Sequence, residues 1–248
     1  MKRIKRFYDV VSVSRVKSNQ FGLLLDGKVV RTPLGNPLTF PSEGIGAAIA
    51  TEWQLQKEFL TPNTMPMNTV LMTYLDVDSK MKREDKVSQI SKFLQTDTLR
   101  FPCVKPESKL KTEQKRRWKK TEQFLASEFG IVMSKVKDGG FLIPSTIAAE
   151  IGEFNAKIFD RYDLLNLTLL ETAAKYLKSC SVGVALVEGA VSPQEAFEAA
   201  YVEELCQQEK WGLVEGEHDV HNAETLLWLN GVSLLATVLK RGGSAAPS

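Results

Sequence analysis

The chain has 248 residues, enough for one large domain or for two smaller domains with cores of their own. Hydrophobic residues make up 43% of the chain and charged residues 25%, which is the composition of an ordinary globular protein. The net charge of +2 gives no argument for nucleic acid as a partner, and no apolar run reaches the roughly 18 residues that a membrane span needs. We therefore expect no nucleic-acid partner and no membrane insertion.

The cysteines and the first residues bear on the compartment. Cys103, Cys180 and Cys206 are far apart in the sequence and odd in number, so they form neither a CxxC pair nor a disulfide framework. This pattern is typical of a reducing compartment. The basic segment Met1–Arg6 is too short for a transit peptide, so we expect a mature form from which the targeting segment is absent.

The first part of the chain carries the strand signals. Residues 7–13 are rich in residues that favour strands. The apolar runs Phe21–Leu25 and Lys28–Thr32 flank Asp26-Gly27, and an Asp-Gly pair in this position is typical of a tight hairpin turn. The pattern predicts a small antiparallel sheet.

Helix signals follow. Pro41-Ser42 begins a helix in which Ile45, Ile49 and Trp53 recur every four residues, so we expect Trp53 to have a structural role in the core. A second helix is predicted from Met67 to about Ser79. Together these elements predict an N-terminal α/β domain, residues 1–81, made of a sheet with covering helices.

Helical periodicity dominates the rest of the chain. We expect a larger all-α orthogonal helix bundle over residues 82–241 and a flexible tail over 242–248, which makes the fold class α+β. The last helix, from Asp219 or Asn222 to about Lys240, is apolar on nearly every side. We therefore expect it in the middle of the bundle.

A basic run lies at the start of one bundle helix. Lys105–Lys120 contains eight bases, on a helix predicted to reach Phe129 and to end at Gly130. RNA binding is one reading of such a run, but Trp118 stands alone and no aromatic platform accompanies it. A solvated face or a patch for an acidic partner is favoured.

The most informative stretch runs from Ser192 to Glu224. Ser192-Pro193-Gln194-Glu195 is a capping box with proline at the first helical position, and the predicted helix ends at Gly212. On this single helix, Glu203 and Gln207 share a face with Ala196, Ala199 and Ala200, whose small side chains allow close approach of a partner; Glu204 and Trp211 lie on a neighbouring stripe. The segment from Glu195 to Glu224 contains nine acidic residues and only one basic residue, Lys210. The concentration indicates either a solvated face or a surface for a basic partner.

An enzymatic reading remains as the alternative. Glu215, His218 and His221 form a loop with the Glu-x-x-His spacing of di-iron sites, and a metal- or small-molecule-dependent enzyme would use these residues. A four-helix carboxylate site needs two such motifs, however, and both histidines of the chain lie in this one loop. No nucleotide-binding motif and no nucleophile with an adjacent base is present. We expect no enzyme activity, no metal and no cofactor.

Seven blocks of sequence resemble one family. They are R-F-Y (6–8), L-D-G-K (25–28), T-P-L-G (32–35), P-S-x-x-x-x-x-A-I-A-T-E-W-x-x-Q (41–56), M-P-M (65–67), F-L-x-T-D-T (93–98) and E-E-x-x-Q-x-x-x-W-G (203–212). No single block is specific, but in this order and spacing they resemble the mitochondrial F1-ATPase assembly factor 2 family.

The resemblance implies a chaperone and a site. It implies a monomer in the mitochondrial matrix that binds the unassembled α subunit of the ATP synthase F1 sector and hands it on for assembly of the α/β hexamer. The family's functional acid maps to Glu203 or Glu204, and the choice between them is open. The expected partner-binding residues are Glu203, Glu204, Gln207, Trp211, Gly212 and Glu215.

Overall fold

The computed structural model describes residues 4–18, 20–105, 108–136, 144–212, 216 and 218–243. Residue contacts divide the chain into two compact units. The N-terminal unit comprises Met1–Met81 with Leu234–Ser248, and the helical unit comprises Lys82–Ser233. The contacts thus group the end of the last helix with the N-terminal unit.

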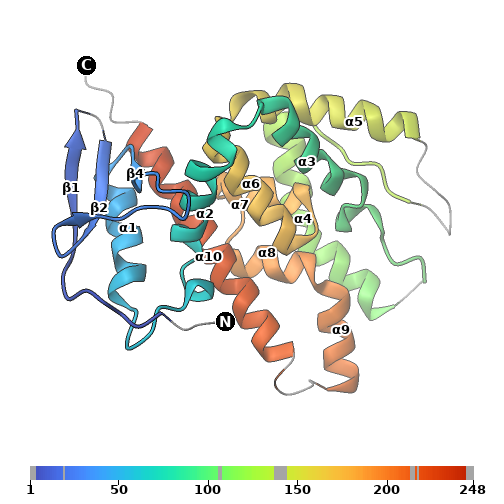
Figure 1. Ribbon diagram of the computed structural model, residues 1–248. Coiled ribbons are helices and arrows are strands. Elements are labelled where there is room, and N and C mark those ends of the chain that lie inside the picture. Colours follow the sequence, from blue (N-terminus) through green and yellow to red (C-terminus); the bar gives the residue numbers. More distant parts are fainter. Residues whose placement is uncertain are drawn as a thin grey trace. The chain divides into compact units, whose positions relative to one another are not determined.

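The N-terminal unit contains a small antiparallel sheet (Figure 1). Its strands are β1 (Val11–Lys17), β2 (Gln20–Leu25), β3 (Lys28–Val29) and β4 (Thr39–Phe40). The strand order is β1-β2-β3, and β4 also pairs with β2. Asp26 and Gly27 have φ angles of 47° and 77°, and this backbone conformation closes the β2–β3 hairpin. The predicted hairpin is therefore confirmed, although the first strand begins at Val11 and not at residue 7.

Helix α1 (Glu43–Gln54) covers the sheet. Ser42 caps its first turn by accepting a hydrogen bond from the Ile45 N–H. Gly46 allows close contact, because a Cβ at this position would lie 2.5 Å from the Phe40 ring and 2.6 Å from a Val13 methyl carbon. The helix thus lies directly on the strands.

Helix α2 (Pro66–Asp76) packs against α1, and the buried Glu52 carboxylate of α1 caps its first turn. Glu52 accepts hydrogen bonds from the backbone N–H groups of Met67 and Asn68, at 2.9 and 2.8 Å. The neighbouring Trp53 is 7% exposed and donates its indole N–H to the Asn68 side chain. The Tyr8 hydroxyl donates in turn to the Trp53 carbonyl. These contacts support a structural role for Trp53, which stays a prediction.

The helical unit consists of α-helices with connections of different lengths between them (Figure 1). The α-helices that begin in this unit are α3 (Arg83–Gln95), α4 (Lys109–Phe129), α5 (Pro144–Lys157), α6 (Leu164–Leu177), α7 (Cys180–Glu188), α8 (Pro193–Ala200), α9 (Val202–Trp211) and α10 (His218–Gly243). Among the described residues, 3-10 turns lie at Pro62–Thr64, Asp78–Lys80, Thr98–Arg100 and Phe159–Arg161. The predicted α+β class is confirmed. None of the described helices has the length and apolar character needed to cross a membrane.

The innermost helix is α7, not the last helix. Every residue from Cys180 to Val187 is buried, and α3, α4, α6 and α8 all contact this helix. Helix α10, which we expected at the centre, leaves Leu227 38% and Leu234 45% exposed. Its apolar surface is only partly covered, so an apolar composition did not indicate a central position for this helix.

A buried acid fixes the start of α7. Asp97 is fully buried and accepts hydrogen bonds from the Ser179 hydroxyl and the Ser181 N–H, at 2.8 and 2.9 Å. Arg100, three residues later, is also fully buried and forms an ion pair with Glu150 of α5 at 2.6 Å. The T-D-T-L-R segment therefore joins α3, α5 and α7, which is a structural role.

We predict that Trp53→Arg unfolds the N-terminal unit. The substitution buries an unpaired charge and removes the packing of the indole, at a cost of about 3–5 kcal/mol. Thermal unfolding followed by circular dichroism measures the effect, with Trp53→Phe as the milder control. A Trp53→Arg protein with the wild-type melting temperature would contradict the core role.

The buried Glu52 predicts a pH dependence of stability. Burial raises the pKa of Glu52 to about 7, against the lowering effect of its two backbone hydrogen bonds. The folded state therefore binds a proton that the unfolded state has released, and the free energy of unfolding falls by roughly 3 kcal/mol as the pH rises from about 4.5 to about 7.

Urea unfolding at a series of pH values tests this dependence. Glu52→Gln should remove this component of the slope, whereas Glu43→Gln, at the exposed start of α1, should retain it. Equal slopes in Glu52→Gln and wild type would show that Glu52 is not responsible.

Candidate functional site

The acidic stretch forms two helices, α8 and α9, and not the single helix that we expected. The capping box is present at Ser192 and Glu195, and Gly212 ends α9 with a φ of 88°. Between the helices, Tyr201 leaves the helical conformation, with φ −105° and ψ 24°. Its ring is buried, and its hydroxyl donates a hydrogen bond to the Tyr176 carbonyl at 2.6 Å.

This break changes the face on which the acids lie. The three alanines of α8, at 196, 199 and 200, are buried in the helical unit and at most 8% exposed. They offer no surface for the close approach of a partner. The expected pairing of Glu203 and Gln207 with a stripe of small residues is therefore wrong.

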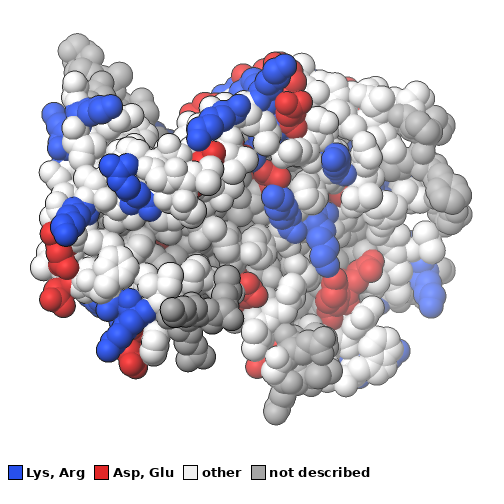
Figure 2. All heavy atoms as spheres, in the orientation of Figure 1, with Lys and Arg blue, Asp and Glu red and all other residues white. Residues whose placement is uncertain are grey.

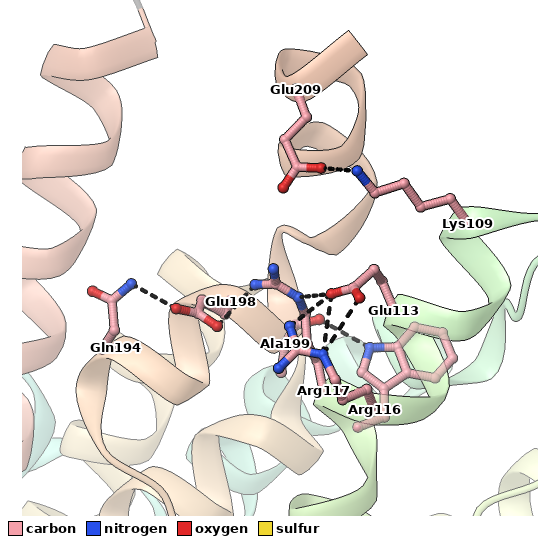
Figure 3. A network of polar contacts seen from close by, with 9 residues as sticks. Lys109, Glu113, Arg116, Arg117, Gln194, Glu198, Ala199 and Glu209 are labelled. Carbon is pink, nitrogen blue, oxygen red and sulfur yellow. Dashed lines mark hydrogen bonds and ion pairs between the residues drawn. The ribbon is translucent and has the colours of Figure 1, made fainter.

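The basic helix α4 pairs with the acidic helices (Figure 3). Three ion pairs join them, namely Lys120–Glu195 and Arg117–Glu198, both at 2.9 Å, and Lys109–Glu209. The Trp118 indole N–H also donates to the Ala199 carbonyl at 2.9 Å. On the face of the helical unit drawn in Figure 2, basic and acidic side chains lie next to one another. Glu195, Glu198 and Glu209 are thus committed to bases of the same chain.

The pairing at Arg117 is the least exposed part of this network. Its side chain is 13% exposed and contacts Glu113 as well as Glu198 (Figure 3). Arg116 and Arg117 together lower the pKa of Glu113 to about 2. The other two pairs are exposed, and exposed pairs stabilise by no more than about 1 kcal/mol each. Their main effect is to neutralise charge.

Glu203 and Glu204, at the start of α9, differ in their surroundings. Glu203 accepts a hydrogen bond from the Gln114 side chain of α4 at 3.3 Å, and burial and the neighbouring Glu204 raise its pKa. Glu204 is exposed and has no hydrogen-bond or ion-pair partner among the described residues. Glu203 is exposed as well, so the two acids differ in that Glu204 has no described partner.

Glu204 lines a pocket of about 400 Å³ between α9 and the start of α10, which we call the α9 pocket. Tyr201, Gln207, Trp211 and His221 also line it. The Trp211 side chain is 71% exposed and presents a large aromatic surface beside the pocket. The pocket therefore combines a free carboxylate, an amide and aromatic rings.

Two lysines of the chain already lie over these rings. The Lys178 ammonium is 5.4 Å from the centre of the Tyr201 ring, and the Lys210 ammonium is 4.8 Å from the centre of the Trp211 ring. Both distances are in the range of a cation–π contact. The rings of the pocket thus accommodate cations.

The residues expected at the partner site are brought together in part. Glu204, Gln207, Trp211 and Gly212 all line the α9 pocket, whereas Glu203 faces α4. Glu215 lies outside the described residues. The sequence analysis missed Lys178 and Tyr201, which line the pocket from the α6–α7 and α8–α9 junctions. Only the tertiary fold places these residues near α9.

The alternative enzymatic site was expected in the loop that carries Glu215, His218 and His221. Glu215 and the side chain of His218 are not described, and His221 packs edge-on against Tyr201 with 5.5 Å between ring centres. Within the described residues, no three His, Cys, Asp or Glu side chains gather as metal ligands would. Burial raises the pKa of the Cys206 thiol, which makes it a weaker nucleophile.

The sequence matches a known protein family and proteins of known name. The model of the ATP12 chaperone protein family matches residues 5–126. The mitochondrial protein atp12 of Schizosaccharomyces pombe is 23% identical over 221 residues, which cover 86% of this chain and 76% of that protein.

Two solved structures share the fold. One is Atu1473, a putative chaperone from Agrobacterium tumefaciens, with 27% identity, a TM-score of 0.82 and coverage of 95% of this chain and 86% of that one. The other is Atp12 from Paracoccus denitrificans, with 23% identity, a TM-score of 0.79 and coverage of 95% and 98%. The chain is thus similar to the ATP12 chaperone family over most of its length.

Proposed function

We propose that this assembly chaperone of the F1-ATPase binds the unassembled α subunit of the F1 sector and hands it on for assembly of the α/β hexamer. The partner-binding residues of this proposal are Glu203, Glu204, Gln207, Trp211, Gly212 and Glu215. Within this set, Glu204 carries the direct charge contact, and Glu203 holds α9 to α4.

One observation carries the proposal: Glu204 is the acid of α9 without a partner among the described residues, and it lines a pocket beside the exposed Trp211. An unassembled subunit exposes apolar surface that its neighbours would cover, and such surface aggregates. A tryptophan covers apolar area, while a carboxylate selects a cation on the client. The combination suits a protein that must hold a client and later release it.

The proposal includes the mode and place of action. The chaperone acts by binding alone, as a monomer, without catalysis, metal or cofactor. It works in the mitochondrial matrix, since its fission yeast relative is a mitochondrial protein. Release follows when a β subunit competes for the same interface, which requires moderate affinity.

Co-purification with isolated α and β subunits in parallel tests the choice of client. The chaperone should retain the α subunit and not the β subunit. Retention of the β subunit alone, or of neither subunit, would refute the proposed client.

We predict that Glu204→Lys weakens binding of the α subunit by roughly 2–5 kcal/mol, because a charge contact at an interface becomes a repulsion. The chaperone should stay folded, since this side chain is exposed and has no described partner. The dissociation constant and the melting temperature measure the two effects.

Glu209→Lys is the matched control. It makes the same charge reversal on the same helix, but Glu209 does not line the α9 pocket and is 52% exposed. Loss of its exposed ion pair should change binding by less than about 1 kcal/mol. Equal losses in both variants would indicate a general electrostatic effect and would remove Glu204 from the contact.

A further inference from the structure

The N-terminal unit contains a second pocket, of about 560 Å³, which we call the hairpin pocket. Its walls come from Phe7, Tyr8 and Trp53 and from the hairpin between Leu25 and Arg31. Three of the sequence blocks described above, R-F-Y, L-D-G-K and A-T-E-W, therefore meet at this pocket. The function proposed for α9 gives them no role.

The pocket has a rigid apolar floor and one exposed aromatic ring. Tyr8, Leu25 and Trp53 are at most 7% exposed, and hydrogen bonds hold Tyr8 and Trp53 in place. Phe7, in contrast, is 67% exposed, and its ring stands edge-on to Tyr8 with 5.5 Å between centres. A phenylalanine left in solvent beside a hollow is a surface that gains free energy when a partner covers it.

The rim of the hairpin pocket is basic. The Lys28 side chain has no hydrogen-bond or ion-pair partner among the described residues, and the Arg31 guanidinium donates to the Gly35 carbonyl at 2.7 Å. Asp26 also lines the pocket, but its carboxylate accepts backbone N–H groups of Asp9 and Val10 at 3.1 and 2.8 Å. The Asp26 carboxylate is thus hydrogen-bonded to the backbone. Neither Lys28 nor Arg31 forms an ion pair with a carboxylate among the described residues.

We propose that the hairpin pocket binds an apolar side chain flanked by a carboxylate, on a segment of the unassembled client. The apolar side chain covers Phe7 and enters the pocket, and the carboxylate pairs with Lys28 and Arg31. The identity of the client rests on the function proposed above. The chemistry is the opposite of that of the α9 pocket, where the free group is an acid and the client must supply a cation. Two contacts of opposite charge select one client more strictly than one contact can.

Two variants with matched controls test this site. Phe7→Asp should weaken binding of the α subunit roughly tenfold or more, because it removes apolar area and repels the carboxylate. Leu55→Asp is its control, since Leu55 is 71% exposed in the same unit but does not line the pocket. The double variant Lys28→Glu/Arg31→Glu should have a similar effect, with the exposed Lys57→Glu as control. Binding that is the same in the variants and their controls, with the wild type bound normally, would refute the hairpin pocket and leave the proposed function intact.

A probe without the client separates the two proposals. 1-Anilinonaphthalene-8-sulfonate combines an aromatic group with an anion, which is the chemistry of the proposed ligand. Titrated into the full chain, it should show one binding site that is lost in Phe7→Asp and in Lys28→Glu/Arg31→Glu and kept in both controls. If the wild type does not bind the α subunit, the proposed client is wrong and this titration alone decides the pocket: equal binding in variants and controls overturns it.

Discussion

The pairing of the basic helix α4 with the acidic helices α8 and α9 determines what the helical unit can offer a partner. Three ion pairs and the Trp118 hydrogen bond hold these elements together. They also neutralise Glu195, Glu198 and Glu209, so the acidic stretch is not a uniformly negative surface. Within α8 and α9, the carboxylate left without a described partner is Glu204, beside an exposed tryptophan. A single selective contact of this kind suits a chaperone better than a broad acidic face, which would bind many basic proteins.

Local signals in the sequence predicted most of the elements. The hairpin at Asp26-Gly27, the cap at Ser42, the capping box at Ser192 and the glycine stops at 130 and 212 are all present, since each depends on a few adjacent residues. The predictions were wrong where contacts between residues distant in the sequence determine the local structure. The helix from Ser192 breaks at Tyr201, because burial of that ring and its bond to Tyr176 override helical periodicity.

The sequence indicated which residues of α9 belong to the candidate site, but not how they are arranged in space. The E-E-x-x-Q-x-x-x-W-G block lies on α9, and its residues Glu204, Gln207 and Trp211 line one pocket. The sequence could not separate Glu203 from Glu204, because the difference lies in Gln114 on another helix. The basic run was visible as a charge pattern, but its partners were visible only in the folded chain. Composition likewise placed α10 at the centre of the bundle, where α7 lies.

In the proposed function, the open side of α9 contacts the client, and α4 and α8 hold α9 in place. Hydrogen–deuterium exchange of the chaperone with and without the α subunit tests this claim most directly. We expect slower exchange in Val202–Trp211 and in the first turns of α10 when the α subunit is bound, with exchange in α4 unchanged. Protection of α4 with unchanged exchange in α9 would contradict it.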